Sequence, residues 1–208
     1  MKFEGIKLVS LDIFDTTLII KKNNWMQEVA KYFSAEQTAL LDPANLRHRF
    51  LCDNVSMIAT LQSLNLLRDE HVSDIQQLID AECASIEPVL FAKEILEEIT
   101  QAHNYKLAVI SNLGYDYGKP ALAALNHSID YTLFSYEVGY KKPDQEIFQK
   151  LITLSGLQPY EILHIGNSYK NDYLGAKEAG MHAIHLDLQR TSIADAKIST
   201  IAELVHYL

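Results

Sequence analysis

Asp12 is the first residue of the chain whose position suggests chemistry, because it directly follows the apolar stretch Ile6–Leu11. Apolar surroundings raise the pKa of a carboxyl group, whereas a nearby cation lowers it. An aspartate held beside a lysine or a divalent ion is therefore an ionised nucleophile of the kind that forms an aspartyl-phosphate. An N-cap or loop aspartate is the alternative that this position alone leaves open.

Two further positions offer groups that bind anions. Ser111 and Asn112 follow the segment KLAVI, and their hydroxyl and amide suit an anion, although an ordinary turn has the same composition. Lys142 precedes Pro143, whose ring restricts the backbone beside it. A lysine held there can neutralise a nucleophile and a transferring group, and a solvated surface lysine is the alternative.

The segment GNSYKNDYLGA, residues 166–176, gathers short oxygen-bearing side chains in one loop. Mg²⁺ takes one or two carboxylates together with waters and phosphate oxygens. The candidate ligands in this loop are Asn167, Ser168, Asn171 and Asp172. The same residue types also cap helices, which is the structural alternative.

Five short apolar segments alternate with helical ones and are predicted as buried strands. Strands separated by helical crossovers form a parallel sheet with helices on both faces. Ligands of such sheets bind beyond the carboxyl ends of the strands, so Asp12, Ser111-Asn112 and Gly166-Asn167 are expected to lie close together. The predicted strands are Ile6–Leu11, Lys106–Ser111, Asp130–Ser135, Ile162–Ile165 and His182–Asp187.

The stretch from about Trp25 to Ser85 is predicted to be helical throughout, and it is too long for one crossover helix. We therefore predict an α/β core domain formed by residues 1–19 and 86–208, with an all-helical cap domain formed by residues 20–85. Asp42 and Pro43 are the expected N-cap and first residue of one cap helix.

The 208 residues are 48% hydrophobic and 22% charged, which excludes a disordered chain or a fibrous repeat. A formal net charge of −9 argues against a nucleic-acid or anionic-membrane surface, so local groups must bind any anionic substrate. Cys52 and Cys83 cannot form a disulfide framework and indicate a reducing compartment. Because the sequence shows neither a membrane span nor a signal-peptide pattern, a cytoplasmic location is predicted.

In this order, the four polar segments resemble the motifs of the haloacid dehalogenase superfamily, and the likeness covers nearly all of the predicted core. The first motif, Asp-x-Asp-x-Thr after a strand, corresponds to residues 12–16, DIFDT. The second and third motifs are a Ser or Thr after a strand and a lysine, here Ser111 in VISN and Lys142 in YKKPDQEIF. The fourth, a loop of the type Gly-Asp-x-x-x-x-Asp, corresponds to Gly166-Asn167 through Asp172.

The resemblance implies a Rossmann-like three-layer sandwich with a five-stranded parallel sheet in the order 3-2-1-4-5, and a helical cap inserted after the first motif. It implies that Asp12 attacks phosphorus and forms an aspartyl-phosphate, which water then hydrolyses. The substrate-binding residues that it implies are Ser111, Asn112, Thr16 and Lys142. The Mg²⁺ ligands that it implies are Asp12, the backbone carbonyl of Phe14, Asn167 and Asp172.

Phe14 departs from the family pattern, because phosphatases of this family have an aspartate there as general acid/base. A phenyl ring cannot donate a proton, and general acid catalysis typically contributes about 10²–10⁴-fold. Its loss matters most for poor leaving groups such as sugar alkoxides, less for aryl or acyl phosphates, and least for halide. Asp15 is the candidate substitute acid, although in a straight strand it points away from Asp12.

Asn167 is the second departure, because it stands where the family has the first acid of the fourth motif. An amide oxygen still ligates Mg²⁺, but the site loses one negative charge. We therefore expect a metal site that is weakened rather than abolished, with Asp172 as the remaining carboxylate of that motif.

These observations predict a Mg²⁺-dependent phosphatase that acts on a small phosphate ester or acyl phosphate through Asp12, with no nucleic-acid or membrane partner. An aromatic residue at position 14 is shared with metal-independent 2-haloacid dehalogenases of the superfamily, in which an aspartate attacks carbon and expels halide. That reaction needs a cap arginine; Arg47 and Arg49 are candidates, and an ordinary surface position is their alternative. A domain that binds a phosphorylated ligand without turnover is the third hypothesis.

Overall fold

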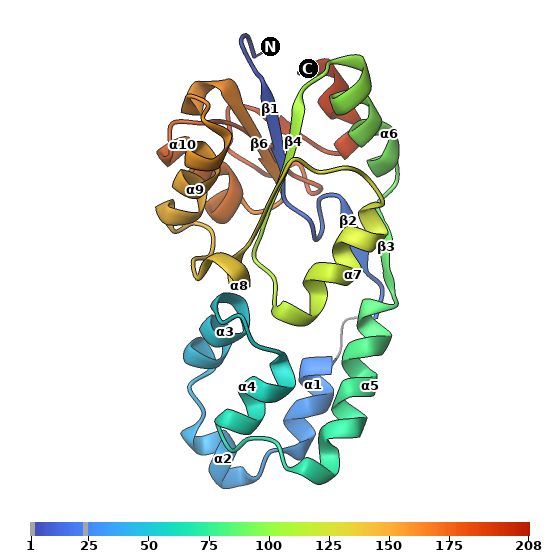
Figure 1. The fold of residues 1–208 in the computed structure, drawn as a ribbon, viewed down its shortest axis with the longest axis vertical. Helices are drawn as coiled ribbons and strands as arrows, with labels where there is room; N and C mark the ends of the chain where they lie inside the picture. The colour runs from blue at the N-terminus through green and yellow to red at the C-terminus, as the bar shows by residue number, and fades with distance from the viewer. Residues whose placement is uncertain (1–2, 23–24) are drawn as a thin grey trace.

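The computed structural model describes residues 3–22 and 25–208. Residues 1–2 of the predicted core and 23–24 of the predicted cap lie outside the described residues. Two regions follow one another along the long axis of the molecule: a sheet with helices on both faces, and a group of helices beyond one end of it (Figure 1).

The main sheet is parallel and contains six strands in the order β5-β4-β1-β6-β7-β8. The prediction of a parallel sheet in the order 3-2-1-4-5 is confirmed for the first five of these, but the predicted number of five is wrong. The sixth strand, β8, has only two residues, which is too short to show an apolar alternation in the sequence. The strands are β1 (Leu8–Leu11), β4 (Lys106–Ser111), β5 (Tyr131–Phe134), β6 (Ile162–Gly166), β7 (His182–Leu186) and β8 (Lys197–Ile198).

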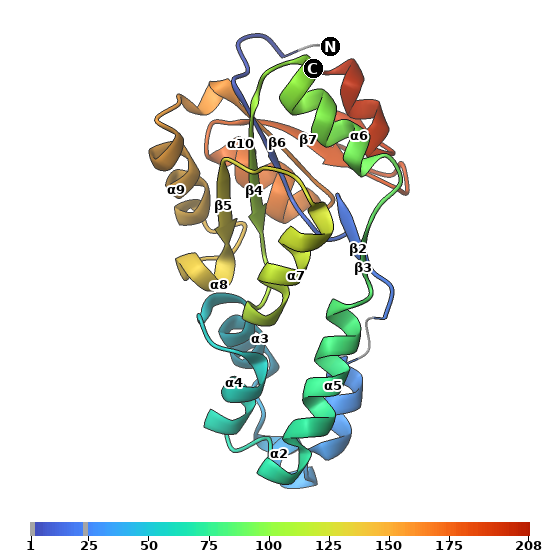
Figure 2. The ribbon, with the colours of Figure 1, turned by 45° about the vertical axis from the view of Figure 1, so that its right-hand side comes forward.

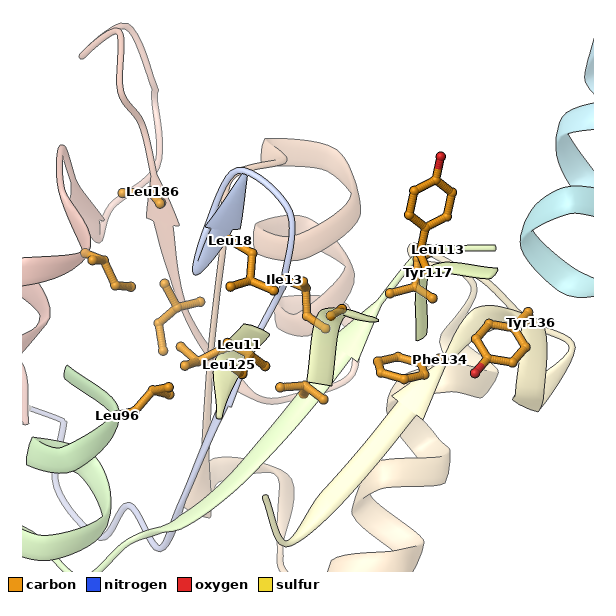
Figure 3. Packing of buried hydrophobic residues seen from close by; sticks show 14 of the residues in the cluster. Leu11, Ile13, Leu18, Leu96, Leu113, Tyr117, Leu125, Phe134, Tyr136 and Leu186 are labelled. Carbon is orange, nitrogen blue, oxygen red and sulfur yellow. The ribbon is translucent and has the colours of Figure 1, made fainter. Parts of the chain in front are cut away.

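Alternate residues of the strands pack on opposite faces of the sheet, which creates three layers. Leu8 and Ala108 belong to the buried cluster that includes residues of α9 (Gln145–Ser155) and α10 (Gly175–Glu178). Val9 and Val109 belong to the cluster on the other face, with residues of α6 (Ala92–Glu97) and α7 (Tyr115–Leu125). Figure 2 shows the two helical layers on either side of the sheet, and Figure 3 shows the second cluster from close by.

Shorter helical segments complete the described residues of this region. The turn α8 (Ser135–Val138) follows β5, and the chain ends in a 3-10 helix at Ile201–His206. A 3-10 turn at Pro159–Glu161 precedes β6, and π-helical segments at Glu98–Ala102 and Tyr169–Leu174 adjoin α6 and α10. Among the residues that the structure describes, no helix has the length and apolar content needed to cross a bilayer.

The helices beyond the sheet lie between two short strands, β2 (Leu18–Ile20) and β3 (Ile86–Pro88), which pair in antiparallel fashion. This ribbon was not predicted, because three-residue strands carry no readable periodicity. We call the helices between its strands the helical insert: α1 (Trp25–Val29), α2 (Ala35–Leu40), α3 (Pro43–Cys52), α4 (Met57–Ser63) and α5 (Val72–Cys83). The domain boundaries at residues 20 and 86 stay a prediction.

The helical insert is attached to the sheet region through polar contacts on α7. Buried Glu82 accepts a hydrogen bond from the backbone N–H of Trp25 at 2.7 Å and another from the Tyr117 hydroxyl at 2.6 Å. The Asp116 carboxylate accepts from the N–H of Met57, the first residue of α4, at 2.8 Å. Because three insert helices are bonded directly or through Glu82 to α7, the position of the insert over the sheet is defined by specific contacts.

Candidate active site

The polar residues at the carboxyl ends of three adjacent strands meet in one place, as predicted from a parallel sheet. β1 lies between β4 and β6, so Asp12, Ser111 and Asn167 follow or end neighbouring strands. They face a cavity of about 280 Å³ between the sheet and α3 of the helical insert. The cavity is lined by Asp12, Phe14, Asp15, Arg47, Leu51, Ser111, Asn112, Lys142, Asn167, Ser168, Asn171 and Asp172.

The ammonium group of Lys142 lies at the centre of the buried polar groups. Its Nζ donates to Asp12 Oδ1 at 2.7 Å, to Asp172 Oδ1 at 2.5 Å and to the carbonyl oxygen of Ile110 at 2.8 Å. An ammonium has three N–H donors, so all of them are used. Only 3% of Lys142 is exposed, so the two carboxylates and this cation compensate one another out of contact with water.

Asn112 holds the backbone of Lys142 through both ends of its amide. The Lys142 N–H donates to Asn112 Oδ1 at 2.7 Å, and Asn112 Nδ2 donates to the Lys142 carbonyl at 2.8 Å. Asn112 therefore positions the lysine. Its predicted contact with substrate stays a prediction.

Asp172 is fixed by donors other than Lys142. Its Oδ2 accepts from the N–H of Ser168 at 2.8 Å, and its Oδ1 lies 3.3 Å from His164 Nε2. An ionised carboxylate only accepts hydrogen bonds, so Nε2 of His164 donates to Asp172, while Nδ1 lies 3.0 Å from Ser10 Oγ. Ser10 and His164 are register partners on β1 and β6, which is why their side chains meet.

Gly166 allows Asp172 to fold back against the end of β6. A Cβ on Gly166 would lie 2.2 Å from Asp172 Cγ, a distance that no side chain can tolerate. Glycine is therefore required where the fourth-motif loop begins, so that the carboxylate can reach Lys142 and His164.

The two carboxylates have opposite pKa shifts although they share one lysine. Burial raises the pKa of Asp12 and the Asp172 charge acts in the same direction, while Lys142 opposes both. Burial also disfavours charge on Asp172, but Lys142 and His164 outweigh it and hold the pKa of Asp172 well below its ordinary value. Burial lowers and both carboxylates raise the pKa of Lys142, and the net result is a raised pKa. Asp172 is thus the permanent counter-ion of Lys142, and Asp12 is the carboxylate whose charge is more easily given up.

The turn after Asp12 settles the direction of Asp15. The carbonyl of Ile13 accepts from the N–H groups of Thr17 at 2.8 Å and Leu18 at 2.9 Å, so the chain turns immediately after β1. Asp15 has a left-handed backbone (φ 59°), and its exposed side chain lines the same cavity as Asp12. The straight-strand expectation that it points away does not apply, because the strand ends before it.

Phe14 and Thr16 differ in whether they face the cavity. Phe14 lines the cavity, and its ring packs edge-on against Tyr117, with ring centres 6.0 Å apart. Thr16 is fully buried outside the residues that line the cavity, and within the described part of the chain its hydroxyl has no hydrogen-bond partner. The structure therefore does not bring Thr16 to the other predicted substrate-binding residues, and its role stays a prediction.

The donors at this cavity fit a weak Mg²⁺ site. Over residues 3–22 and 25–208, no three His, Cys, Asp or Glu side chains form a group that could hold a metal. Both oxygens of Asp172 already accept hydrogen bonds, so the carboxylate best able to ligate is that of Asp12. Asn167 lines the cavity beside it, and its backbone carbonyl accepts from His185 Nε2 at 3.0 Å, which fixes the loop. One carboxylate with amide and carbonyl oxygens is a donor set that Mg²⁺ accepts, with less charge than two carboxylates supply.

His164 belongs to none of the four motifs, and its alignment with Ser10 on the neighbouring strand is the signal that could have placed it beside Asp172. Of the two candidate arginines, Arg47 is the one that the packing of α3 places at the cavity. Arg49, the other candidate, does not line the cavity and instead pairs with Asp53 at 3.0 Å.

Comparison with known proteins agrees with this arrangement. The chain matches the family model of the haloacid dehalogenase-like hydrolases over residues 12–186. The chain belongs to this family of hydrolases. Its motif residues Asp12, Ser111, Lys142 and Asp172 all fall within the matched region.

Individual relatives match a part of the chain. The chain is 45% identical over 84 residues to the Rhythmically expressed gene 2 protein of Drosophila melanogaster, a match that covers 38% of this chain and 32% of that protein. It is 33% identical over 93 residues to the glyceraldehyde 3-phosphate phosphatase of Methanothermobacter thermautotrophicus, which covers 44% of this chain and 41% of that protein. The chain thus spans less than half the length of these curated relatives. The crystal structure of a 2-haloacid dehalogenase from Pseudomonas syringae pv. Tomato DC3000 has the same fold, with a TM-score of 0.68, 22% identity and 97% coverage of both chains.

Replacing Lys142 by Met tests whether its ammonium holds the two carboxylates together. Lys142→Met leaves two buried carboxylates without a cation, so we expect the free energy of unfolding at pH 7 to fall by about 3–5 kcal/mol. Burial and Asp172 then raise the pKa of Asp12 further, so the folded variant binds a proton that the unfolded chain releases. The stability of the variant therefore increases as the pH is lowered from about 7 to about 5, as urea unfolding at both pH values would show.

The double variant Asp12→Asn, Lys142→Met is the matched control, because it removes one of the two charges. It should be more stable at pH 7 than Lys142→Met alone. Equal stability of Lys142→Met and the unmodified protein would contradict the central role of this ammonium.

Proposed function

We propose that this hydrolase is a phosphatase that cleaves small phosphate esters or acyl phosphates through a phosphoryl group carried on Asp12. The observation that supports this most directly is the contact of Asp12 with Lys142 at 2.7 Å in a cavity that also contains Ser111. A carboxylate nucleophile with a cation beside it is the arrangement that phosphoryl transfer needs. The phosphatase activity named for the archaeal relative agrees with the proposal.

In the proposed reaction, an Asp12 oxygen attacks phosphorus and the bond from phosphorus to the leaving oxygen breaks. Water then attacks the phosphorus of the aspartyl-phosphate, which releases inorganic phosphate and restores the carboxylate. The Asp12 carboxylate gives up its own charge when it becomes phosphorylated, and Lys142 keeps Asp172 as its counter-ion throughout. Ser111 is proposed to hold a phosphoryl oxygen, together with Lys142, whose bond to Asp12 is released when that carboxylate is phosphorylated.

We also propose that Mg²⁺ is held by Asp12, the backbone carbonyl of Phe14 and Asn167, with Asp172 placed behind them. When bound, Mg²⁺ supplies positive charge to the phosphoryl oxygens. The helical insert is proposed to act as the cap of the family, and a cytoplasmic location stays a prediction.

A second candidate, the metal-independent 2-haloacid dehalogenase, is favoured by Phe14 and by the presence of Arg47 at the cavity. In that reaction Asp12 attacks carbon and the carbon–halogen bond breaks, so no leaving-group acid is needed. Chloride release from 2-chloropropionate in EDTA, without phosphate release from any phosphate ester, would establish this candidate. Ligand-dependent stabilisation with no turnover of either kind would instead favour a phospho-ligand-binding domain.

The nucleophile is tested with Asp12→Asn. Because the amide cannot attack phosphorus, phosphate release from p-nitrophenyl phosphate should fall by roughly 10³-fold or more. Undiminished turnover would overturn the proposal. Circular dichroism and the melting temperature of the variant serve as folding controls.

The residue at position 14 predicts which substrates are cleaved fastest. Because Phe14 cannot protonate the leaving oxygen, kcat on p-nitrophenyl phosphate or acetyl phosphate should exceed kcat on glucose 6-phosphate by about 10²-fold or more. Phe14→Asp should narrow this difference. Asp15→Asn should slow only the sugar phosphate if the exposed Asp15 carboxyl acts as a partial substitute acid. Equal rates on both substrate types in the unmodified protein would contradict the argument from Phe14.

The residue at position 167 predicts a weak metal site that can be strengthened. Asn167→Asp adds a carboxylate to the proposed ligands, so the dissociation constant of Mg²⁺ measured by calorimetry should fall by about tenfold or more. Asn171→Asp places the same charge in the same cavity outside the proposed ligand set. If it strengthens binding equally, the effect is general electrostatics and the assignment of Asn167 is wrong.

A further inference from the structure

Arg47 of the helical insert lies at the same cavity as Asp12 and Lys142, although it is far from them in the sequence. Leu51, one helical turn after Arg47 on α3, lines the cavity as well. Residues four apart on a helix share one face, so α3 presents a cation and an apolar side chain together to the site. Apart from this pair, the lining residues come from the sheet region and its loops.

The position of Arg47 is set by rigid elements. Asp42 caps the N-terminus of α3 by accepting from the N–H groups of Ala44 and Asn45. At the other end of the helix, the insert lies directly against Gly114, the N-cap of α7. A Cβ on Gly114 would lie 3.1 Å from the carbonyl oxygen of Phe50 and 2.5 Å from Met57 Cε. The close approach allowed by this glycine holds α3 over the strand ends.

Arg47 differs from Lys142 in its partners within the described part of the chain. Among residues 3–22 and 25–208, its guanidinium takes part in no hydrogen bond or ion pair, whereas Lys142 is fully used by Asp12, Asp172 and Ile110. The remaining charged residues that line the cavity are aspartates. With a net charge of −9 on the chain, a free guanidinium there is a local anion site in a field that otherwise repels anions.

The size and lining of the cavity indicate which kind of anionic group Arg47 can bind. A volume of about 280 Å³ lies just below the range of typical small-molecule sites, roughly 300–1,000 Å³, so a substrate with a short carbon skeleton fits it. Phe14 and Leu51 supply apolar contacts for that skeleton. A guanidinium binds a carboxylate through two parallel hydrogen bonds. A carboxylate brings one charge to this single cation, whereas a second phosphate brings about two next to three aspartates.

We propose that Arg47 binds a carboxylate of the substrate, so that the preferred substrates are small phosphate esters that also carry a carboxylate group. The proposal rests on the phosphatase function proposed above and names its substrate class. In this arrangement, Asp12 attacks the phosphoryl group at one end of the substrate, and Arg47 on α3 binds the carboxylate at the other end.

The test compares 3-phosphoglycerate with glycerol 3-phosphate, which differ in a carboxylate against a hydroxymethyl group. Both have an alkoxide leaving group, so the missing acid at position 14 affects them equally. The unmodified protein should prefer 3-phosphoglycerate in kcat/KM by about tenfold or more, mainly through KM. Arg47→Gln should abolish this preference and leave kcat/KM on glycerol 3-phosphate and p-nitrophenyl phosphate unchanged.

Arg49→Gln is the matched control, because Arg49 lies on the same helix and pairs with Asp53 away from the cavity. It should retain the preference for 3-phosphoglycerate. Propane-1,3-diyl bisphosphate is a further test substrate, in which a second phosphate replaces the carboxylate. A preference for it over 3-phosphoglycerate would overturn the assignment of a carboxylate. The proposal is also overturned if Arg47→Gln slows p-nitrophenyl phosphate as much as 3-phosphoglycerate, since Arg47 would then bind the transferring phosphoryl group.

A binding measurement separates failure of this proposal from failure of the phosphatase proposal. Calorimetry with 3-phosphonopropionate and propylphosphonate, which cannot be hydrolysed, should show tighter binding of the carboxylate by about tenfold, lost in Arg47→Gln. If no phosphate ester is cleaved but this difference is found, the carboxylate site stands and the phosphatase proposal fails. If p-nitrophenyl phosphate is cleaved but neither pair of compounds is distinguished, the phosphatase proposal stands and the carboxylate site is wrong.

Discussion

One buried ammonium group, that of Lys142, joins the parts of the chain that form the site. It is bonded to a carboxylate after β1, to a carboxylate in the loop after β6, and to a backbone carbonyl of β4. Each of these partners lies on or after a different strand of the sheet. The three contacts therefore exist only when β1, β4 and β6 are paired in the observed register. A charge of this kind is costly to bury alone, which makes the folded sheet and the paired charges depend on one another.

The two carboxylates bonded to Lys142 have different hydrogen-bond donors and opposite pKa shifts. Asp172 has backbone and imidazole donors in addition to Lys142, and its pKa is well below the ordinary value. Asp12 has fewer donors, and its pKa is raised by burial and by its neighbour. The structure thus provides two different environments for a carboxylate around one cation, and the proposed nucleophile is the carboxylate with the raised pKa.

The helical insert and the sheet region contribute different kinds of residue to the cavity. The strand ends and the loops of the sheet region supply oxygens and the buried lysine, whereas α3 supplies Arg47 and Leu51. Contacts through Glu82, Asp116 and Gly114 hold the insert against α7. This division means that residues of α3 can change without disturbing the charges around Lys142, and we expect substrate preference to follow the insert.

Patterns in the sequence were sufficient for the α/β class, five of the strands and the four groups of polar residues, whereas the order of the strands followed from the resemblance to the family. Apolar runs of four to six residues identify buried strands, and the polar residue that ends each run lies at the carboxyl edge of a parallel sheet. The strand β8 and the ribbon formed by β2 and β3 were missed, because two or three residues are too few for any periodicity.

Tertiary structure alone decided three features of the site. Asp15 faces the cavity because the chain turns at Ile13, two residues after the end of β1, which no alternation pattern records. His164 meets Asp172 because β6 pairs with β1 in a particular register, and Arg47 reaches the strand ends because Gly114 lets α3 approach α7. The sequence determines which residues end a strand, because the end of a strand depends on the order of apolar and polar residues next to each other in the chain. Contacts between side chains of separate segments depend instead on packing between residues that are far apart in the sequence. Only the folded chain therefore specifies which of these side chains share a proton, a charge or a cavity.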